Sequence, residues 1–177
     1  MKTSDPDIYA GGDCVEVDNV LTGEKTWQPM GSVANRQGRV IADNIAGIPS
    51  TFHGVAGTAI MKAFEYTIGK TGLTKEQALA KGFEAEAVTI VDADTPHFMP
   101  GSAPITIRLV ADRRTRKVLG AQLFGPGRAD KRLDILVAAV TGGLTIDMLG
   151  NTDVAYAPPY STALDPVTHA ANTLKNK

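Results

Sequence analysis

The side chains that could do chemistry are few and widely spaced. The 177-residue chain has a single cysteine, Cys14, and three histidines, His53, His97 and His169. One cysteine excludes both an internal disulfide and a Cys-x-x-Cys redox centre. Histidines this far apart in the sequence do not predict a zinc site, so we expect no bound metal. The other candidate groups lie in two short segments, one near each end of the chain.

The candidate residues of these two segments are Asp13 and Tyr156. Asp13 follows Gly11-Gly12, and the apolar run before it predicts a strand over Asp7 to Ala10 that stops at a glycine turn. Near the other end, Ala155 to Pro159 cannot form a regular element, because adjacent prolines hold the backbone extended.

Two further groups each allow two interpretations. The cations Lys131-Arg132 stand at the start of a predicted helix, where positive charge opposes the helix dipole unless an anion is close. They either bind an anion or form a solvated face, and we favour the solvated face. His97, in a proline-rich loop over Thr95 to Pro104, either lines a substrate channel or is a surface histidine.

Composition and charge exclude several classes of partner. The chain is 43% hydrophobic and 21% charged, a balance that can bury a core of one domain, with room for a detached piece of another. A net charge of −1 gives no field of one sign to hold nucleic acid or an anionic membrane. No apolar run approaches the roughly 20 residues that a membrane span needs. We therefore expect a cytoplasmic protein that binds neither nucleic acid nor membrane.

Hydrophobic periodicity and turn signals predict the elements that position these groups. We expect helices over Ser32 to Ile45, Thr74 to Lys81, Asp130 to Val140, Thr145 to Leu149 and from Asp165-Pro166 onward. Ser32 and Thr74 are the expected caps of the first two, and Thr74 with Gln77 makes a capping box. We expect strands over Thr58 to Ile68, Ala87 to Val91, Ile105 to Asp112 and Lys117 to Phe124, with a loop over Val15 to Pro29.

This order of elements predicts an α+β fold. Strands that arrive as hairpins, followed by helices that cluster at the end, favour an antiparallel sheet with helices packed on one side. The first strand and helix do not fit comfortably into that sheet. We therefore divide the chain into residues 1–49, which belong to another domain, and residues 50–177, which form the α+β domain.

Several motifs together resemble the FAD-dependent pyridine nucleotide-disulfide oxidoreductases. Asp5-Pro-Asp-Ile-Tyr-Ala-Gly-Gly-Asp13 is similar to their second flavin-contacting motif, and Pro29 to Arg39 is similar to the start of the helix that follows. Gly57 to Lys62, the Thr71 to Thr74 turn, His97 to Gly101, Gly120 to Gln122 and Ala129 to Asp134 resemble the family's dimerisation domain. Ala155-Tyr-Ala-Pro-Pro-Tyr-Ser161 followed by Asp165-Pro is similar to the coenzyme A-disulfide reductase and NADH oxidase/peroxidase branch.

The resemblance implies a flavin role for the first segment. Residues 1–49 would be the C-terminal fragment of an FAD-binding domain, with Gly12, Asp13 and Cys14 at the cofactor. A glycine lets the backbone approach a cofactor, and Asp13 would accept a hydrogen bond from the ribityl chain. The alternative for Asp13 is a solvated turn aspartate. Cys14 would be a small residue beside the flavin rather than the redox nucleophile, and the helix after Pro29 would direct its dipole to the flavin edge.

The resemblance also implies a dimer with shared active sites. Residues 50–177 would form the dimerisation domain of a homodimer, and Tyr156 would enter the partner's site to hydrogen-bond a thiolate or peroxide. The alternative is a tyrosine that only packs at the subunit interface, where this residue type is enriched. No His-Pro-Thr…Glu dyad of the glutathione reductase branch is present, and Phe98-Met99 replaces the tyrosines usual in coenzyme A-disulfide reductases.

The whole enzyme implied by the resemblance passes electrons from NADH or NADPH through FAD and a cysteine centre. Its acceptor would be a disulfide, persulfide, peroxide or oxygen. The sequence has no Gly-x-Gly-x-x-Gly loop, so the N-terminal FAD and NAD domains and the redox cysteine are expected to be missing here, and this portion alone is expected to be inactive. The alternative function is a stand-alone dimerising interaction module without catalytic activity.

Overall fold

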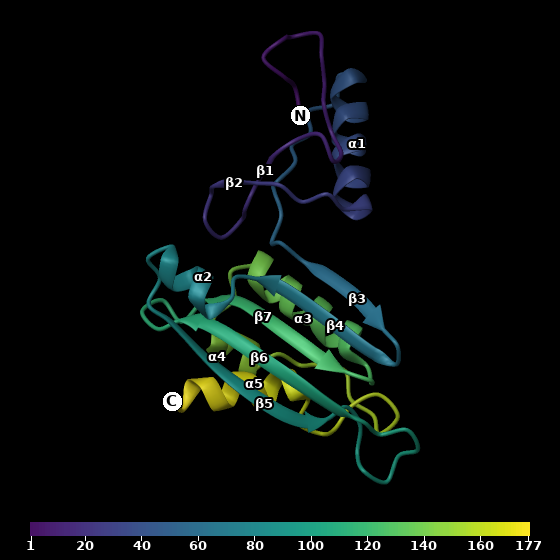
Figure 1. Ribbon diagram of the computed structural model, residues 1–177, viewed down its shortest axis with the longest axis vertical. Coiled ribbons are helices and arrows are strands. Elements are labelled where there is room, and N and C mark those ends of the chain that lie inside the picture. The colour runs from purple at the N-terminus through teal and green to yellow at the C-terminus, as the bar shows by residue number, and fades with distance from the viewer. The chain divides into compact units, whose positions relative to one another are not determined.

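The computed structural model describes residues 1–177 and shows two compact units, Met1–Val55 and Ala56–Lys177 (Figure 1). Val55 belongs to the first unit because its backbone exchanges hydrogen bonds with Asp18 and Val20. None of the helices is long and apolar enough to cross a membrane.

The first unit is built around one helix and a small hairpin. Helix α1 spans Gly31–Ile45, and strands β1 (Val17–Asp18) and β2 (Lys25–Thr26) pair antiparallel. Val17, Val33 and Val55 form its buried apolar core, on which Phe52 and Met30 pack.

Three expectations about this unit were wrong. The predicted strand over Asp7 to Ala10 forms only an isolated bridge between Lys2 and Tyr9, because no neighbouring strand is present for it to pair with. The predicted loop over Val15 to Pro29 contains the β1–β2 hairpin, which turns at Gly23 with φ of 69°. Met30, not Ser32, occupies the N-cap of α1, and no side chain caps it.

The second unit is a five-stranded antiparallel sheet, which confirms the predicted α+β fold. Its strand order is β3-β4-β7-β6-β5. The strands are β3 (Ala59–Ala63), β4 (Tyr66–Gly72), β5 (Ala85–Ala93), β6 (Pro104–Asp112) and β7 (Val118–Gly125). The helices are α2 (Lys75–Ala80), α3 (Ala129–Thr141), α4 (Ile146–Gly150) and α5 (Pro166–Lys175).

Three of the four helices, α3, α4 and α5, gather on one face of the sheet, as expected, whereas the short α2 pairs through Glu76 with Arg108 on the other face. Helix α3 packs on β4 and β7, and α5 packs on β5 and β6 (Figure 1). Alternate residues of β6, Ile105, Ile107 and Leu109, are fully buried, as the two-residue period of a strand requires. Helix α3 approaches β4 so closely that a Cβ on Gly69 would lie 2.8 Å from Leu133 Cδ2.

The capping box of α2 and the proline in the first turn of α5 were predicted from the sequence. The Thr74–Gln77 capping box opens α2, with Gln77 N–H donating to Thr74 Oγ1 at 3.2 Å. Asp165 caps α5 by accepting from Val167 N–H at 2.9 Å, and Pro166 stands in its first turn. Each of these is a contact between residues close in sequence, which is why the pattern alone sufficed.

The single predicted strand over Thr58 to Ile68 is wrong, because the structure has a hairpin there. Strands β3 and β4 are joined at Phe64-Glu65, with Ala63 paired to Tyr66. Phe64 has φ of 54°, in the left-handed region, and is 90% exposed. A turn without glycine, asparagine or proline at its tip gives no sequence signal for where the strand breaks.

Replacing Phe64 with glycine is expected to stabilise the chain. A β-carbon in the left-handed region costs about 1 kcal/mol, whereas glycine adopts that conformation freely. We expect Phe64→Gly to raise the free energy of unfolding by roughly 0.5–1 kcal/mol in urea denaturation. Phe64→Ala is the matched control, since it removes the exposed ring but keeps the β-carbon. Equal effects of the two substitutions would show that the backbone conformation is not the cause.

Candidate functional site

The glycine turn of the first unit is held against helix α1. Gly12 has φ of 88°, and its N–H donates to the side-chain oxygen of Gln37 at 2.6 Å. A Cβ on Gly11 would lie 2.9 Å from Ile41 Cδ1. The backbone at Gly11-Gly12 therefore lies close to α1, and the positive φ of Gly12 favours glycine at that position.

The two predicted flavin-contacting residues after this turn are exposed. Asp13 has an exposed side chain, and its backbone oxygen accepts a hydrogen bond from Trp27 Nε1 at 2.8 Å. The exposed Cys14 thiol donates to the Gly11 carbonyl at 3.4 Å. Trp27 thus ties the turn to the segment that leads into α1.

The residues present fit one edge of a flavin site. The glycine backbone offers a close approach, and Asp13 offers a carboxylate to a sugar hydroxyl. The first turn of α1 has no acidic residue and no side-chain cap, so its amide end stays available to an electron-rich group. These features make FAD binding chemically reasonable at this turn, where the resemblance expects it.

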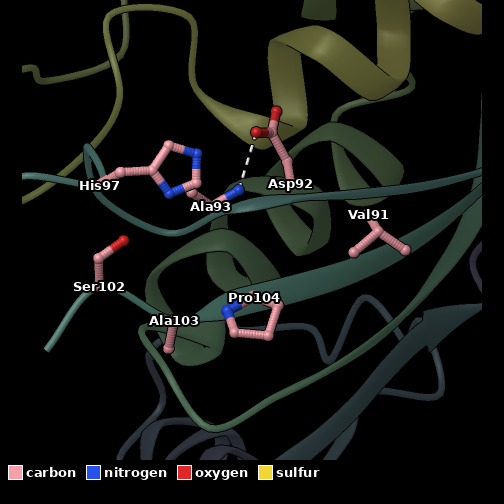
Figure 2. Close-up of a pocket in the computed structure, with 7 residues that line it drawn as sticks. All are labelled: Val91, Asp92, Ala93, His97, Ser102, Ala103 and Pro104. Carbon is pink, nitrogen blue, oxygen red and sulfur yellow. Dashed lines mark hydrogen bonds between the residues drawn. The ribbon is translucent and has the colours of Figure 1, made fainter.

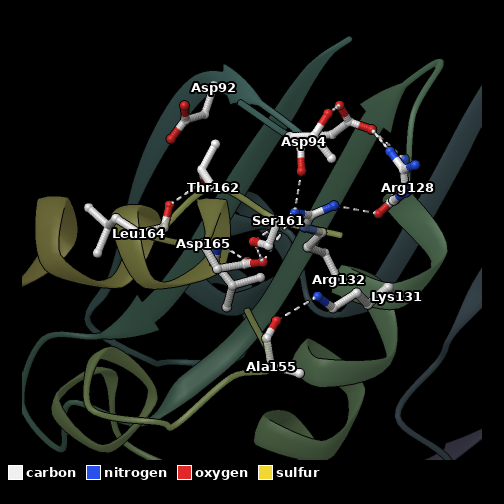
Figure 3. Close-up of polar contacts among 12 residues, drawn as sticks. Asp92, Asp94, Arg128, Lys131, Arg132, Ala155, Ser161, Thr162, Leu164 and Asp165 are labelled. Carbon is white, nitrogen blue, oxygen red and sulfur yellow. Dashed lines mark hydrogen bonds and ion pairs between the residues drawn. The ribbon is translucent and has the colours of Figure 1, made fainter. Parts of the chain in front are cut away.

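In the second unit, the chemistry centres on Arg132, whose side chain is fully buried. Its guanidinium pairs with the Asp165 carboxylate at 3.1 Å and donates to Asp94 O at 2.8 Å and Ser161 Oγ at 3.3 Å (Figure 3). It also donates to the carbonyl of Arg128 at 3.1 Å. The expected solvated face is therefore wrong for this residue: the anion that satisfies the cation is a carboxylate of the chain itself.

Lys131 lies beside this network with its ammonium group near the surface. Its Nζ donates to the carbonyl of Ala155 at 3.2 Å (Figure 3). At the far end of the same segment, Ser161 Oγ–H donates to Asp165 at 2.7 Å. The segment from 155 to 161, which we call the arm, is thus held at both ends by side chains of α3 and by the cap of α5.

Asp94 is the second buried centre and fixes the loop after β5. It accepts from Ala103 N–H at 2.9 Å and from Arg128 through both its backbone N–H and its guanidinium. Burial raises the pKa of Asp94, but these hydrogen bonds, that from Thr95 and the Arg128 charge outweigh it and hold the pKa below the ordinary 3.8. The 94–103 loop is thereby anchored to the start of α3.

Through Arg132 the loop and the arm become one structure with exposed aromatic side chains. Arg132 contacts both, since it binds Asp94 O on the loop and Ser161 on the arm. Phe98 is 77% exposed, Tyr156 54% and Tyr160 62%. More than half of the surface of Tyr156 is therefore open to contact with another molecule.

A pocket of about 350 Å³ opens beside the 94–103 loop. It is lined by Val91, Asp92, Ala93, His97, Ser102, Ala103 and Pro104 (Figure 2). The exposed His97 is one of its lining residues, while His169 pairs with Asp92 at 2.7 Å from helix α5. Across residues 1–177 no group of three or more His, Cys, Asp or Glu side chains could hold a metal ion.

Three residues important to these sites were not predicted. Gln37 looked like one polar residue of a helix, and Asp94 like the last residue before a loop. Arg132 did carry a signal, because a cation at a helix start requires an anion. The anion, Asp165, lies 33 positions away in the sequence (165 minus 132), so only the fold could identify it.

Comparison with known proteins identifies the family of this chain. Residues 58–167 match the model of the pyridine nucleotide-disulphide oxidoreductase dimerisation domain. The chain belongs to this family. That match confirms the resemblance inferred from the motifs in the second unit.

The related proteins are oxidoreductases. The chain is 38% identical over 175 residues to an NAD(P)H sulfur oxidoreductase (CoA-dependent) of Pyrococcus furiosus, covering 99% of this chain and 39% of that protein. It is 37% identical over 177 residues to an NADH oxidase of Methanocaldococcus jannaschii, covering 39% of it. The structure of an NAD-dependent persulfide reductase from A. fulgidus matches with a TM-score of 0.97 and 45% identity, over 99% of this chain and 33% of that one.

The dimerisation-domain chain thus spans about two fifths of the curated relatives it matches. The similarity extends through the first unit as well, since nearly the whole chain is covered.

Breaking the Arg132–Asp165 pair is expected to destabilise the chain strongly. Arg132→Met leaves the Asp165 carboxylate buried without its cation, which typically costs about 3–5 kcal/mol. We expect a loss of roughly 3 kcal/mol in the free energy of unfolding, measured by urea denaturation, because Ser161 and Val167 still donate to Asp165.

Two variants serve as controls for that experiment. Arg132→Met with Asp165→Asn removes the unpaired charge while keeping an oxygen for the α5 cap, so it should recover part of the loss. Lys131→Met, on the neighbouring exposed cation, should cost about 1 kcal/mol or less. A cost for Arg132→Met as small as that for Lys131→Met would contradict the role given to the pair.

Proposed function

We propose that this chain supplies the dimer interface, one edge of the flavin site and a substrate-facing tyrosine to an FAD-dependent NAD(P)H oxidoreductase. The observation that carries the proposal is the arm: Arg132 and Asp165 hold it rigidly in a dimerisation-family unit, yet Tyr156 on it stays exposed. A tyrosine that acts in the site of another subunit must be exposed and must have a fixed backbone. Tyr156 is exposed, and the buried Arg132–Asp165 pair holds the arm that carries it.

In this proposal the two units have different tasks. Met1–Val55 is the last part of a flavin-binding domain, and Ala56–Lys177 is the dimerisation domain. Gly12 gives the backbone its close approach, Asp13 accepts from a ribityl hydroxyl, and Cys14 lies beside the cofactor without acting as nucleophile. The bound flavin would supply two-electron redox chemistry between NADH or NADPH and a cysteine centre.

Tyr156 acts on the electron acceptor. Its hydroxyl would donate to a thiolate or peroxide oxygen in the partner's site, and so stabilise negative charge there. Phe98 and Met99 add apolar surface but no second hydroxyl on the 94–103 loop. The acceptor class stays broad, comprising disulfide, persulfide, peroxide or oxygen, and the related proteins named for sulfur, persulfide and NADH oxidation support that range.

The surface next to the arm suits contact with a second copy. An apolar groove of about 440 Å³ lies between α3 and the segment before the arm, and its lining includes Ile135, Ala138, Leu144 and Val154. A two-fold dimer places this patch against itself, and carries both arms toward the opposite subunit. We assign the interface to this groove because its lining continues to Ala155, the first residue of the arm.

We expect the purified chain to be a colourless dimer. Light scattering should give about twice 18.6 kDa, and no flavin absorbance should remain, because most of the cofactor's binding surface is outside these residues. Ile135→Glu should yield a monomer, since it places a charge in the groove. Met61→Glu, on the open face of the sheet, is the matched control and should leave the dimer intact.

Three outcomes would contradict this assignment. A monomeric wild-type chain would remove the shared site, and loss of the dimer in Met61→Glu alone would move the interface to the open sheet face. Stoichiometric FAD on the purified chain would show that it holds the cofactor without further domains.

In the complete flavoprotein, Tyr156→Phe is expected to lower kcat. Removal of a single hydrogen-bond donor to developing charge costs on the order of 10²-fold. Tyr160→Phe, on the same arm, should change kcat little, and both variants should keep their flavin absorbance and dimer mass. A full-length protein that binds no FAD and oxidises no NAD(P)H would instead favour the non-catalytic interaction module.

A further inference from the structure

Gln37 is the one polar side chain of helix α1 that is fully buried. Its side-chain oxygen accepts the Gly12 N–H at 2.6 Å, across 25 residues of sequence. Polar side chains are rarely buried completely unless a hydrogen bond requires it. The position of Gln37 is therefore explained by the turn that it holds and not by the packing of the helix.

The amide of Gln37 has one orientation consistent with this contact. Gly12 N–H is a donor, so the atom facing it must be the amide oxygen, and the nitrogen must face away. That nitrogen, Nε2, is buried and has no hydrogen-bond partner in this chain. The amide oxygen is thus satisfied by the turn, whereas the amide nitrogen is a buried donor without an acceptor, which is energetically unfavourable.

The turn is fixed at three consecutive residues. Gly11 lies against Ile41 and the Cβ of Gln37, Gly12 donates to the Gln37 amide, and Asp13 accepts from the Trp27 indole. Only the Gly12 contact uses a side chain whose position is fixed by full burial. Gln37 thus controls the left-handed bend at Gly12, and with it the direction in which the next side chain leaves the backbone.

We propose that Gln37 is the positioning residue of the flavin-contacting turn: it sets the Gly12 backbone so that the Asp13 carboxylate meets the ribityl hydroxyl. This inference rests on the proposed function, in which Asp13 binds FAD.

The turn can be tested in this chain without any flavin. Hydrogen exchange at the Gly12 amide reports the Gln37 contact, and the indole N–H resonance of Trp27, the only tryptophan, reports the position of Asp13. Gln37→Leu should speed exchange at Gly12 at least about tenfold and shift the Trp27 indole resonance. Gln37→Glu, which keeps an acceptor oxygen, should restore protection at Gly12.

A control substitution separates the turn from the helix. Arg39→Leu changes an exposed residue of the same helix and should leave both resonances unchanged. If Gln37→Leu leaves Gly12 exchange and the Trp27 indole as in the wild type, the positioning role is overturned.

A second measurement, of FAD affinity in the complete flavoprotein, separates this inference from the proposed function. We expect Asp13→Ala and Gln37→Leu each to weaken FAD binding about tenfold or more. Weakening by Asp13→Ala alone would overturn the positioning role of Gln37 while leaving the flavin assignment intact. No weakening by Asp13→Ala would instead overturn the flavin role of Asp13, and with it the inference.

Discussion

The second unit depends on how it satisfies one buried guanidinium. Arg132 has no exposed surface, so every favourable interaction that water would give it must come from the chain. The chain provides a carboxylate from the α5 cap, a hydroxyl from the arm, a carbonyl from the 94–103 loop and a carbonyl from the N-cap of α3 itself, and leaves only Nε without a partner. None of these segments can shift without leaving part of that charge unpaired. The main effect of the Arg132–Asp165 pair is therefore to select one arrangement of the loop, the arm and the α5 cap, because the desolvation of both charges offsets much of the stability that the pair contributes.

The position of the arm is also determined by contacts with buried or partly buried side chains. Prolines make residues 158–159 stiff but cannot decide where the segment lies, since an extended chain can leave the sheet in many directions. The contacts at its two ends, Lys131 to Ala155 O and Arg132 and Asp165 to Ser161, select one direction. Exposed aromatic side chains on so constrained a backbone lose little conformational freedom on meeting another molecule. The arm thus combines a backbone held in one place with aromatic side chains that are open to contact.

In the first unit an uncharged side chain, the amide of Gln37, has the part that the Arg132 guanidinium has in the second. Gln37 is buried in α1 and holds a glycine turn through its amide, as Arg132 is buried in α3 and holds a loop and an arm. In both cases a buried side chain holds a backbone segment that carries an exposed one, Asp13 in the first unit and Tyr156 in the second. Under the proposed function, substitutions at the buried residues act through geometry, and those at Asp13 or Tyr156 act on the bound molecule directly.

The sequence by itself determined the α+β class, the hairpin of β6 and β7, the capping box of α2, the proline start of α5 and the family. Each depends on residues close together in the chain or on motifs whose order is visible without a fold. Tertiary structure alone decided that Arg132 is buried against Asp165, that Gln37 holds Gly12, and that Phe64 sits in a hairpin turn. The physical reason is distance along the chain: a charge or amide has no identifiable partner until folding brings a residue tens of positions away within 3 Å or so of it.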